Sequence, residues 1–144
     1  MILDGEQATA DLAAALASVV RAGDVITLSG GLGAGKTTLV RALLRAMGHH
    51  GEVPSPSFAI VQPYDELDLP AWHVDLYRLE NRAEIAELGL DAADDAVLLV
   101  EWPERARPGS WPEALRLTLE ITGPDRRALT AQAPAAWEGR WPPR

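Results

Sequence analysis

Cysteine is absent from the 144 residues of the chain, which excludes disulfide bonds, thiolate metal ligands and a cysteine nucleophile. Long apolar runs are absent as well. The longest run of large apolar residues covers only residues 97–100, far fewer than a membrane span needs. The first residues lack the basic region and apolar stretch of a signal peptide, so we expect a cytoplasmic protein with no membrane partner.

Positive charge is also scarce. Acidic residues outnumber basic residues by 21 to 13, and the formal net charge is −8. This balance argues against DNA or RNA binding driven by bulk charge, although it leaves room for a local basic patch. The remaining composition, 47% hydrophobic and 24% charged, is ordinary for a globular protein, and the length fits one domain.

Hydrophobic periodicity predicts helices and strands in a mixed order. Leu12, Leu16 and Val19 recur at helical spacing within residues 7–21, and a second helix is expected after a glycine-rich segment, ending before Gly48. Strands are expected at residues 25–28, 58–61, 72–79, 96–100, 115–122 and 127–133, with a short helix over residues 81–88. The last two strands flank a Gly-Pro-Asp turn and predict an antiparallel hairpin. The expected fold is a single-domain, three-layer α/β sandwich with a mixed sheet.

A glycine-rich motif separates the first expected strand from the second helix. Gly30, Gly35, Lys36 and Thr37 match the pattern G-x-x-x-x-G-K-[ST]. Glycines let successive backbone N–H groups turn toward phosphate oxygens, and the helix N-terminus adds its dipole. Lys36 is expected to reach the β- and γ-phosphates, and the Thr37 hydroxyl to bind Mg²⁺. The motif predicts a P-loop NTPase domain over residues 1–133. The segment at residues 134–144 has three prolines and little pattern, so we expect a frayed tail there.

The sequence gives weaker evidence on which nucleotide base is bound and which carboxylate binds the metal. GTPases usually recognise guanine through an Asn-Lys-x-Asp loop, which this chain cannot supply because Lys36 is its only lysine, so ATP is favoured. A P-loop enzyme also needs a carboxylate near Mg²⁺, usually where a buried strand ends. Glu101 follows the apolar run and fits this place. Asp75 is a rival that could orient water or a metal ligand.

Two side chains near these carboxylates, Trp102 and His73, can each have either a structural or a functional role. Trp102 suits stacking on a base as well as packing in the core, and His73 is as consistent with a structural histidine as with a site residue. Ser55 and Ser57 lie in a loop after the P-loop helix, the place of a segment that senses the γ-phosphate. Four arginines suit contacts with a partner, RNA or phosphate, although solvated charge is the default: Arg78, Arg82, Arg105 and Arg107.

Five short motifs occur in a fixed order along the chain. They are Leu-Gly-Ala-Gly-Lys-Thr-Thr at 32–38, Val-Pro-Ser-Pro-Ser-Phe at 53–58, His-Val-Asp-Leu-Tyr-Arg-Leu at 73–79, Glu-Leu-Gly-Leu at 87–90 and Glu-Trp-Pro-Glu-Arg at 101–105. Together they resemble the bacterial TsaE proteins, the small P-loop ATPases of tRNA threonylcarbamoyladenosine biosynthesis. The resemblance covers residues 5–130, and the combination is far more specific than the P-loop alone.

The resemblance implies a weak, Mg²⁺-dependent ATPase that acts with TsaB and TsaD in the threonylcarbamoyl modification of a tRNA adenosine next to the anticodon. It implies that the protein acts on tRNA indirectly, through these partners. Lys36, Asp75 and Glu101 would be catalytic, and Thr37 and Glu101 would serve the metal. The residues implied to contact the nucleotide are Thr9, Gly31, Leu32, Gly33, Ala34, Gly35, Lys36, Thr37, Thr38, Ser55, Ser57 and Trp102.

Three positions depart from the TsaE pattern. Gly31 stands where an acidic residue is common, Ser57 where threonine is common and Ala13 where a helix glycine is frequent. None of these changes removes a phosphate ligand, but Gly31 removes a carboxylate that could contact the metal, a partner or the loop. Two other functions stay open: a small-molecule or nucleotide kinase, and a nucleotide-dependent switch that does not hydrolyse ATP.

Overall fold

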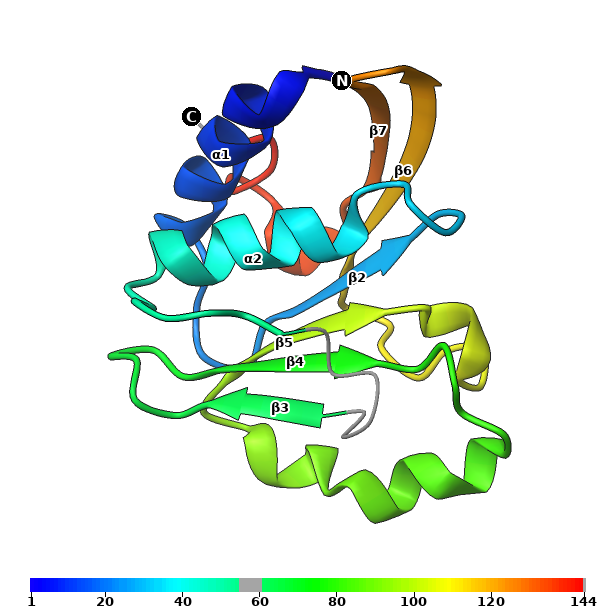
Figure 1. Cartoon of the computed structure of the whole chain (residues 1–144). Helices are drawn as coiled ribbons and strands as arrows, with labels where there is room; N and C mark the ends of the chain where they lie inside the picture. The colour runs from blue at the N-terminus through cyan, green and yellow to red at the C-terminus, as the bar shows by residue number, and fades with distance from the viewer. Residues whose placement is uncertain (55–60, 144) are drawn as a thin grey trace.

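The computed structural model describes residues 1–54 and 61–143 of the chain (Figure 1). Over these residues the chain forms one mixed sheet in the order β1-β7-β6-β2-β5-β4-β3. The strands are β1 (Ile2–Asp4), β2 (Val25–Ser29), β3 (Val61–Tyr64), β4 (Ala71–Asp75), β5 (Val97–Glu101), β6 (Leu115–Gly123) and β7 (Arg126–Gln132). The four central strands are parallel, whereas β1, β7 and β3 add antiparallel edges. This confirms the α/β class, the mixed sheet and the C-terminal hairpin.

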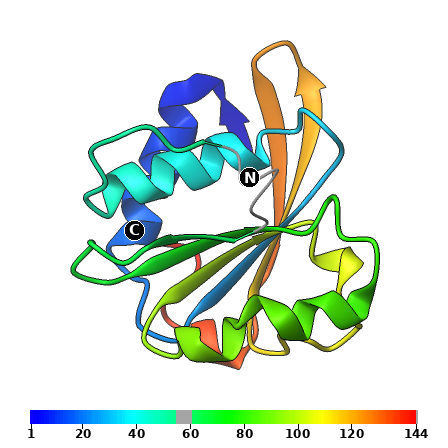
Figure 2. The same cartoon turned by 60° about the horizontal axis from the view of Figure 1, so that its bottom comes forward.

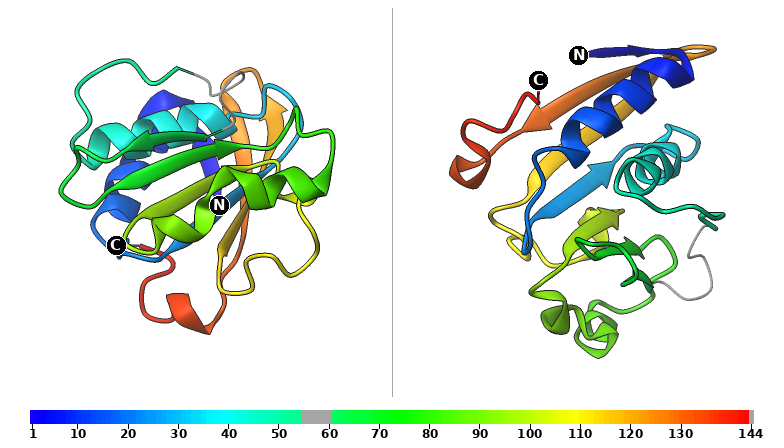
Figure 3. Two further views of the ribbon diagram at one scale, coloured as in Figure 1. Left: turned by 90° about the horizontal axis from the view of Figure 1, so that it is seen from below. Right: turned by 90° about the vertical axis from the view of Figure 1, so that its left-hand side faces the viewer.

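Two helices cover one face of the sheet, as Figure 3 shows in its right-hand view. They are α1 (Gly5–Ala17) and α2 (Lys36–Ala46), and they pack on each other. Their apolar sides join the inward faces of the strands in one buried cluster that includes Leu16, Leu44 and Leu117. Burial of this face fixes the register of β2 and β6, because alternate residues of each strand point to it.

The opposite face of the sheet is covered only in part. Short 3₁₀ helices η1 (Arg82–Leu88) and η2 (Leu90–Ala93) pack against β4 and β5 around Val74, Leu98 and Val100 (Figure 2). The sandwich therefore has three layers over β4 and β5. Over β6 the second face stays open, and Arg116 and Thr118 alternate there as exposed residues with buried leucines.

Several element boundaries differ from those expected. The short strand β1 was not predicted, and of the strand expected at 58–61 only residue 61 lies within the described residues. Strand β4 ends at Asp75 rather than at residue 79, because the Asp75 carboxylate accepts the backbone N–H of Tyr77 and turns the chain. The helix after Asn81 is 3₁₀, and the Asn81 side chain caps it by accepting the N–H of Ala83.

The expectation of a frayed tail differs from the structure over residues 134–143. Trp137, in η4 (Ala135–Trp137), is buried in the main core, and Arg140 stacks over its ring at 4.1 Å. The Arg140 guanidinium donates to Asp24 Oδ2 at 2.6 Å and to the carbonyl of Val19 at 3.0 Å. Side-chain contacts rather than strand pairing hold this segment in place. Hydrophobic periodicity therefore did not predict that it is ordered. No helix among the described residues is long and apolar enough to span a membrane.

Candidate functional site

The P-loop connects the carboxyl end of β2 to the first turn of α2. Gly30, Gly33 and Gly35 have positive φ values of 142°, 76° and 101°, which L side chains rarely adopt. A Cβ at Gly30 would also collide with the carbonyl oxygen of Leu119. Helix α2 begins without a side-chain cap from the described residues, so its first backbone N–H groups are available to an anion.

Lys36 is folded back over the loop that precedes it. Its Nζ donates to the carbonyl oxygens of Gly30 at 2.6 Å and Gly31 at 2.8 Å, and lies 4.3 Å from the centroid of the Trp102 ring. Burial lowers the pKa of Lys36, against the opposing effect of Glu101 and other nearby carboxylates. The ammonium group is therefore a partly desolvated charge at the mouth of the loop, where a phosphate would gain most from it.

Glu101 links the P-loop to the neighbouring strand. It is 2% exposed, and it accepts the Thr37 hydroxyl at 2.8 Å on Oε1 and 3.0 Å on Oε2. Its Oε2 also lies 2.5 Å from Nε2 of His73, a fully buried residue. His73 Nδ1 has no hydrogen-bond partner among the described residues. The histidine thus contacts the same carboxylate oxygen, Oε2, as Thr37, which gives His73 a positioning role that its sequence pattern alone did not decide.

Asp75 lies beside Glu101 because the two are register partners on β4 and β5. Its Oδ1 accepts the N–H of Tyr77 at 3.0 Å. Burial raises the pKa of Asp75, the Tyr77 N–H opposes this rise, and the negative charge of Glu101 adds to it. Two carboxylates therefore face the same loop, and one of them, Asp75, has a raised pKa.

Trp102 adopts a strained backbone conformation directly after Glu101. Its φ of 59° and ψ of 50° are left-handed, which is uncommon for a bulky residue. The ring lies 4.9 Å from that of Tyr77, with the planes tilted by 39°, and covers the ammonium of Lys36. The strain is thus associated with placing an aromatic ring over Lys36, while the partly buried Trp102 also packs against the cluster around Val74 and Val100.

These groups line one open cleft of about 360 Å³. Of the sequence candidates, eleven line it: Leu32, Gly33, Ala34, Gly35, Lys36, Thr37, Thr38, Asp75, Arg78, Glu101 and Trp102. Thr9 lines an adjoining pocket of about 160 Å³, which shares Ala34, Gly35 and Thr38 with the cleft. Gly31 is exposed at the tip of the loop and lines neither cavity. Ser55 and Ser57 lie outside the described residues.

Comparison with known proteins matches this architecture to one family. The model of the family "Threonylcarbamoyl adenosine biosynthesis protein TsaE" matches residues 3–129. The chain belongs to the TsaE family. A TsaE from Bacillus subtilis is 37% identical over 127 residues, which cover 87% of this chain and 79% of that protein. One from Streptomyces coelicolor is 42% identical over 114 residues, covering 76% and 77%.

A solved structure supports the same assignment. The crystal structure of Bacillus subtilis YdiB has a TM-score of 0.77 and 31% identity, and the match covers 97% of this chain and 88% of that chain. The resemblance drawn from the five motifs is thereby confirmed.

Arg127 is a site residue of this TsaE-family chain that sequence reasoning missed. From β7 its Nε donates to the carbonyl of Ala34 at 3.1 Å, and the side chain lines both the cleft and the adjoining pocket. The residue lies 93 positions from the loop it holds, so no local motif connects them. Tyr77 and Arg78 also line the cleft. Arg78 was among the four arginines considered for contacts with a partner, RNA or phosphate, whereas Tyr77 stood in the matched motif at 73–79 without an assigned role.

Gly31, the departure from the TsaE pattern, is open to solvent. A Cβ built on it meets no atom within 4 Å, and its φ is not positive. The position therefore accepts a side chain without strain, and its glycine is not required by the geometry of the loop.

Proposed function

We propose that this chain binds ATP with Mg²⁺ and hydrolyses it slowly, as an accessory ATPase in the threonylcarbamoyl modification of tRNA adenosine, together with TsaB and TsaD. Membership of the TsaE family supports the pathway, because the relatives carry it in their names. The observation that carries the catalytic part is the meeting of Lys36, Thr37 and Glu101 in one cleft beside the glycine-rich loop.

The donor set in the cleft fits Mg²⁺ bound together with a nucleotide. Mg²⁺ is usually held by one or two protein oxygens and completed by phosphates and water. Thr37 and Glu101 offer a hydroxyl and a carboxylate oxygen that are already 2.8 Å apart. Among the described residues no group of three or more His, Asp or Glu side chains forms an all-protein metal cage. When bound, the ion would neutralise negative charge on the phosphates.

The two adjoining cavities would receive different parts of the nucleotide, one the phosphates and the other the base. The phosphates would lie on the amide groups of residues 33–38 and on Lys36, which would exchange its two loop carbonyls for phosphate oxygens. The adjoining pocket, with the half-buried Thr9 on its wall, would take the base. Arg127 lies between the two spaces, and its hold on Ala34 would keep the loop in shape while both are filled.

Asp75 is the better-placed group to accept a proton from the attacking water. Glu101 is occupied by Thr37 and His73, whereas Asp75 Oδ2 has no hydrogen-bond partner within the described residues. Its raised pKa makes it a better proton acceptor than an ordinary aspartate. Water would attack the γ-phosphorus in line, the bond to the β–γ bridging oxygen would break, and the water proton would pass to Asp75.

Turnover by the isolated chain is expected to be slow because the cleft is open. Tyr77 is 37% exposed at its rim, and Arg78 is exposed beside it. A partner covering this rim would exclude water other than the attacking one and strengthen each charge interaction inside. This accounts for the expected dependence on TsaB and TsaD.

Two measurements test the proposal together. ATP affinity and phosphate release would be measured on the chain alone and with the TsaB–TsaD complex, with GTP as the control nucleotide. We expect ATP binding alone, faster phosphate release with the complex, and loss of binding in Lys36→Ala. Phosphate transfer to a small acceptor would instead support a kinase, and binding without any phosphate release in the complex would support a switch.

A further inference from the structure

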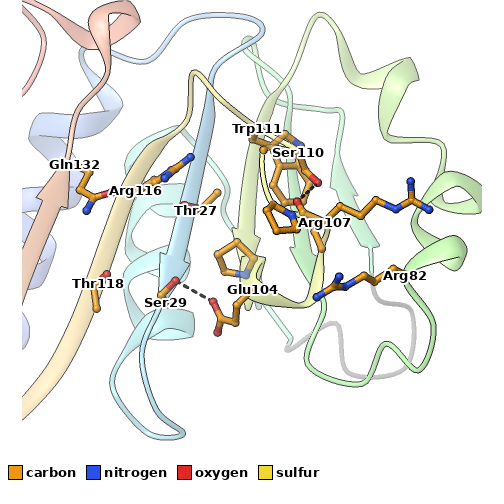
Figure 4. A pocket seen from close by; sticks show the side chains of 14 residues that line it. Thr27, Ser29, Arg82, Glu104, Arg107, Ser110, Trp111, Arg116, Thr118 and Gln132 are labelled. Atoms are coloured by element: carbon orange, nitrogen blue, oxygen red, sulfur yellow. Dashed lines mark hydrogen bonds between the residues drawn. The ribbon is translucent and has the colours of Figure 1, made fainter.

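A second cavity lies across the sheet from α2 and is larger than the P-loop cleft. Its volume is about 470 Å³, and it is bounded by the open face of β2 and β6 and by the segment at residues 103–111 (Figure 4). Thr27, Ser29, Arg116 and Thr118 form its floor. These side chains lie on the face away from the main core, since their neighbours Ile26, Leu28, Leu115 and Leu117 belong to that core. Thr27 is itself buried, whereas Arg116 and Thr118 are exposed.

Positive charge is concentrated on this cavity in a chain of net charge −8. Arg82, Arg107 and Arg116 line it, against a single carboxylate, Glu104. Within the described residues none of these three guanidinium groups is hydrogen-bonded or paired with a carboxylate, whereas Glu104 accepts the Ser29 hydroxyl at 3.1 Å. Figure 4 shows Arg116 lying along the sheet toward Thr27, and Arg82 reaching from η1 toward the 103–111 segment.

The uncharged side chains that line this cavity indicate which class of ligand it would bind. Hydroxyls of Ser and Thr, an amide from Gln132 and free arginines are the groups that contact phosphate and sugar oxygens in nucleic-acid complexes. Trp111, half-buried on the wall, adds an aromatic face of the kind on which unpaired bases stack. An acidic peptide would also pair with the arginines and hydroxyls, but its acidic side chains offer no planar base to stack on the indole of Trp111.

We propose that this cavity binds a single-stranded segment of RNA through its sugar–phosphate backbone, with Trp111 against a base. The inference does not depend on ATP hydrolysis. Its place in the fold is nonetheless close to the P-loop. Ser29 immediately precedes Gly30, and Glu104 lies three residues after Glu101, so the two cavities share the same two segments of chain.

Fluorescence anisotropy of a labelled RNA hairpin with a single-stranded loop tests the proposal on the full chain. The variants are Arg82→Gln with Arg116→Gln, and the matched control is Arg21→Gln with Arg45→Gln, which removes the same charge from exposed arginines that do not line the cavity. We expect the first pair to weaken binding at least tenfold and the control pair to change it less than twofold. The slope of log K against log salt should fall by about 1.4, since each lost single-strand phosphate contact contributes about 0.7.

Three further arms separate this proposal from the alternatives. Lys36→Ala should bind the hairpin as the wild type does, so a failure of ATP binding and a failure of RNA binding are distinguishable. Equal loss in both arginine pairs would overturn the proposal in favour of bulk charge. Displacement of the hairpin by polyglutamate at equal charge concentration would point to an acidic protein segment. Saturable binding of tripolyphosphate, with no binding of the hairpin, would point to a free phosphate ligand. The polyglutamate result or the tripolyphosphate result would each overturn the RNA proposal.

Discussion

The substitution Glu101→Gln separates the metal role of this residue from its role in the fold. Glu101 is buried and is contacted by Thr37 and by His73. Glutamine has the same shape. Its amide oxygen can accept the Nε2–H of His73, while its NH₂ group donates to the Thr37 hydroxyl oxygen, which can accept as well as donate. Since both bonds can be remade, we expect the free energy of unfolding to change by less than about 1 kcal/mol.

The same substitution should weaken the Mg²⁺-dependent part of ATP binding. Hydrogen bonds and ligand contacts made by a charged group are stronger than those of a neutral one by about 1–1.5 kcal/mol, which corresponds to a loss of about fivefold to tenfold in affinity. Calorimetric titration of ATP in the presence of Mg²⁺ and again in the presence of EDTA gives, for each protein, the increment in ATP affinity that Mg²⁺ provides. Glu104→Gln is the control, because Glu104 binds Ser29 and not Thr37. An unchanged increment in Glu101→Gln would refute the assigned role.

Three other substitutions test separate parts of the account. Because burial raises the pKa of Asp75, its charged form destabilises the folded state, and Asp75→Asn should unfold at a higher temperature than the wild type at pH 7. This difference in Tm should vanish below about pH 3.8, where the wild-type carboxyl is protonated in both states. The variant should also release phosphate more slowly, and equal Tm values at pH 7 would contradict the stability argument. Gly30→Ala should abolish ATP binding and cost more than about 1 kcal/mol in denaturant unfolding, whereas Gly31→Ala should cost less than about 0.5 kcal/mol, and similar costs would contradict the steric argument. Trp137→Ala should cost about 3–5 kcal/mol, and a negligible cost would show that the C-terminal segment is not part of the core.

Local patterns predicted the parts of the fold and site that are built from neighbours in sequence. The alternation of Leu115, Leu117 and Leu119 placed β6, and the glycine spacing placed the P-loop between β2 and α2. Glu101 was found for the same reason, since an apolar run that ends in a carboxylate is a local signal. These features follow from periodicity and steric rules that act over a few residues.

The features that escaped prediction depend on residues distant in sequence. Arg127 reaches the P-loop only because β7 and β6 fold back beside β2, and the meeting of His73 with Glu101 depends on the pairing of β4 with β5. Trp137 is buried by a segment with no periodicity, and Arg140 anchors that segment through Asp24. Such contacts are decided by the tertiary fold, so a single sequence shows the residues but not their partners.

Calorimetric titration of ATP into the chain in the presence of Mg²⁺, with Lys36→Ala measured in parallel, tests the central claim most directly. The account expects one binding site in the wild type, an affinity that falls when Mg²⁺ is removed, and no measurable binding in the variant, whose fold should be checked by thermal unfolding. Absence of binding in the wild type, or equal binding in a folded Lys36→Ala, would contradict it.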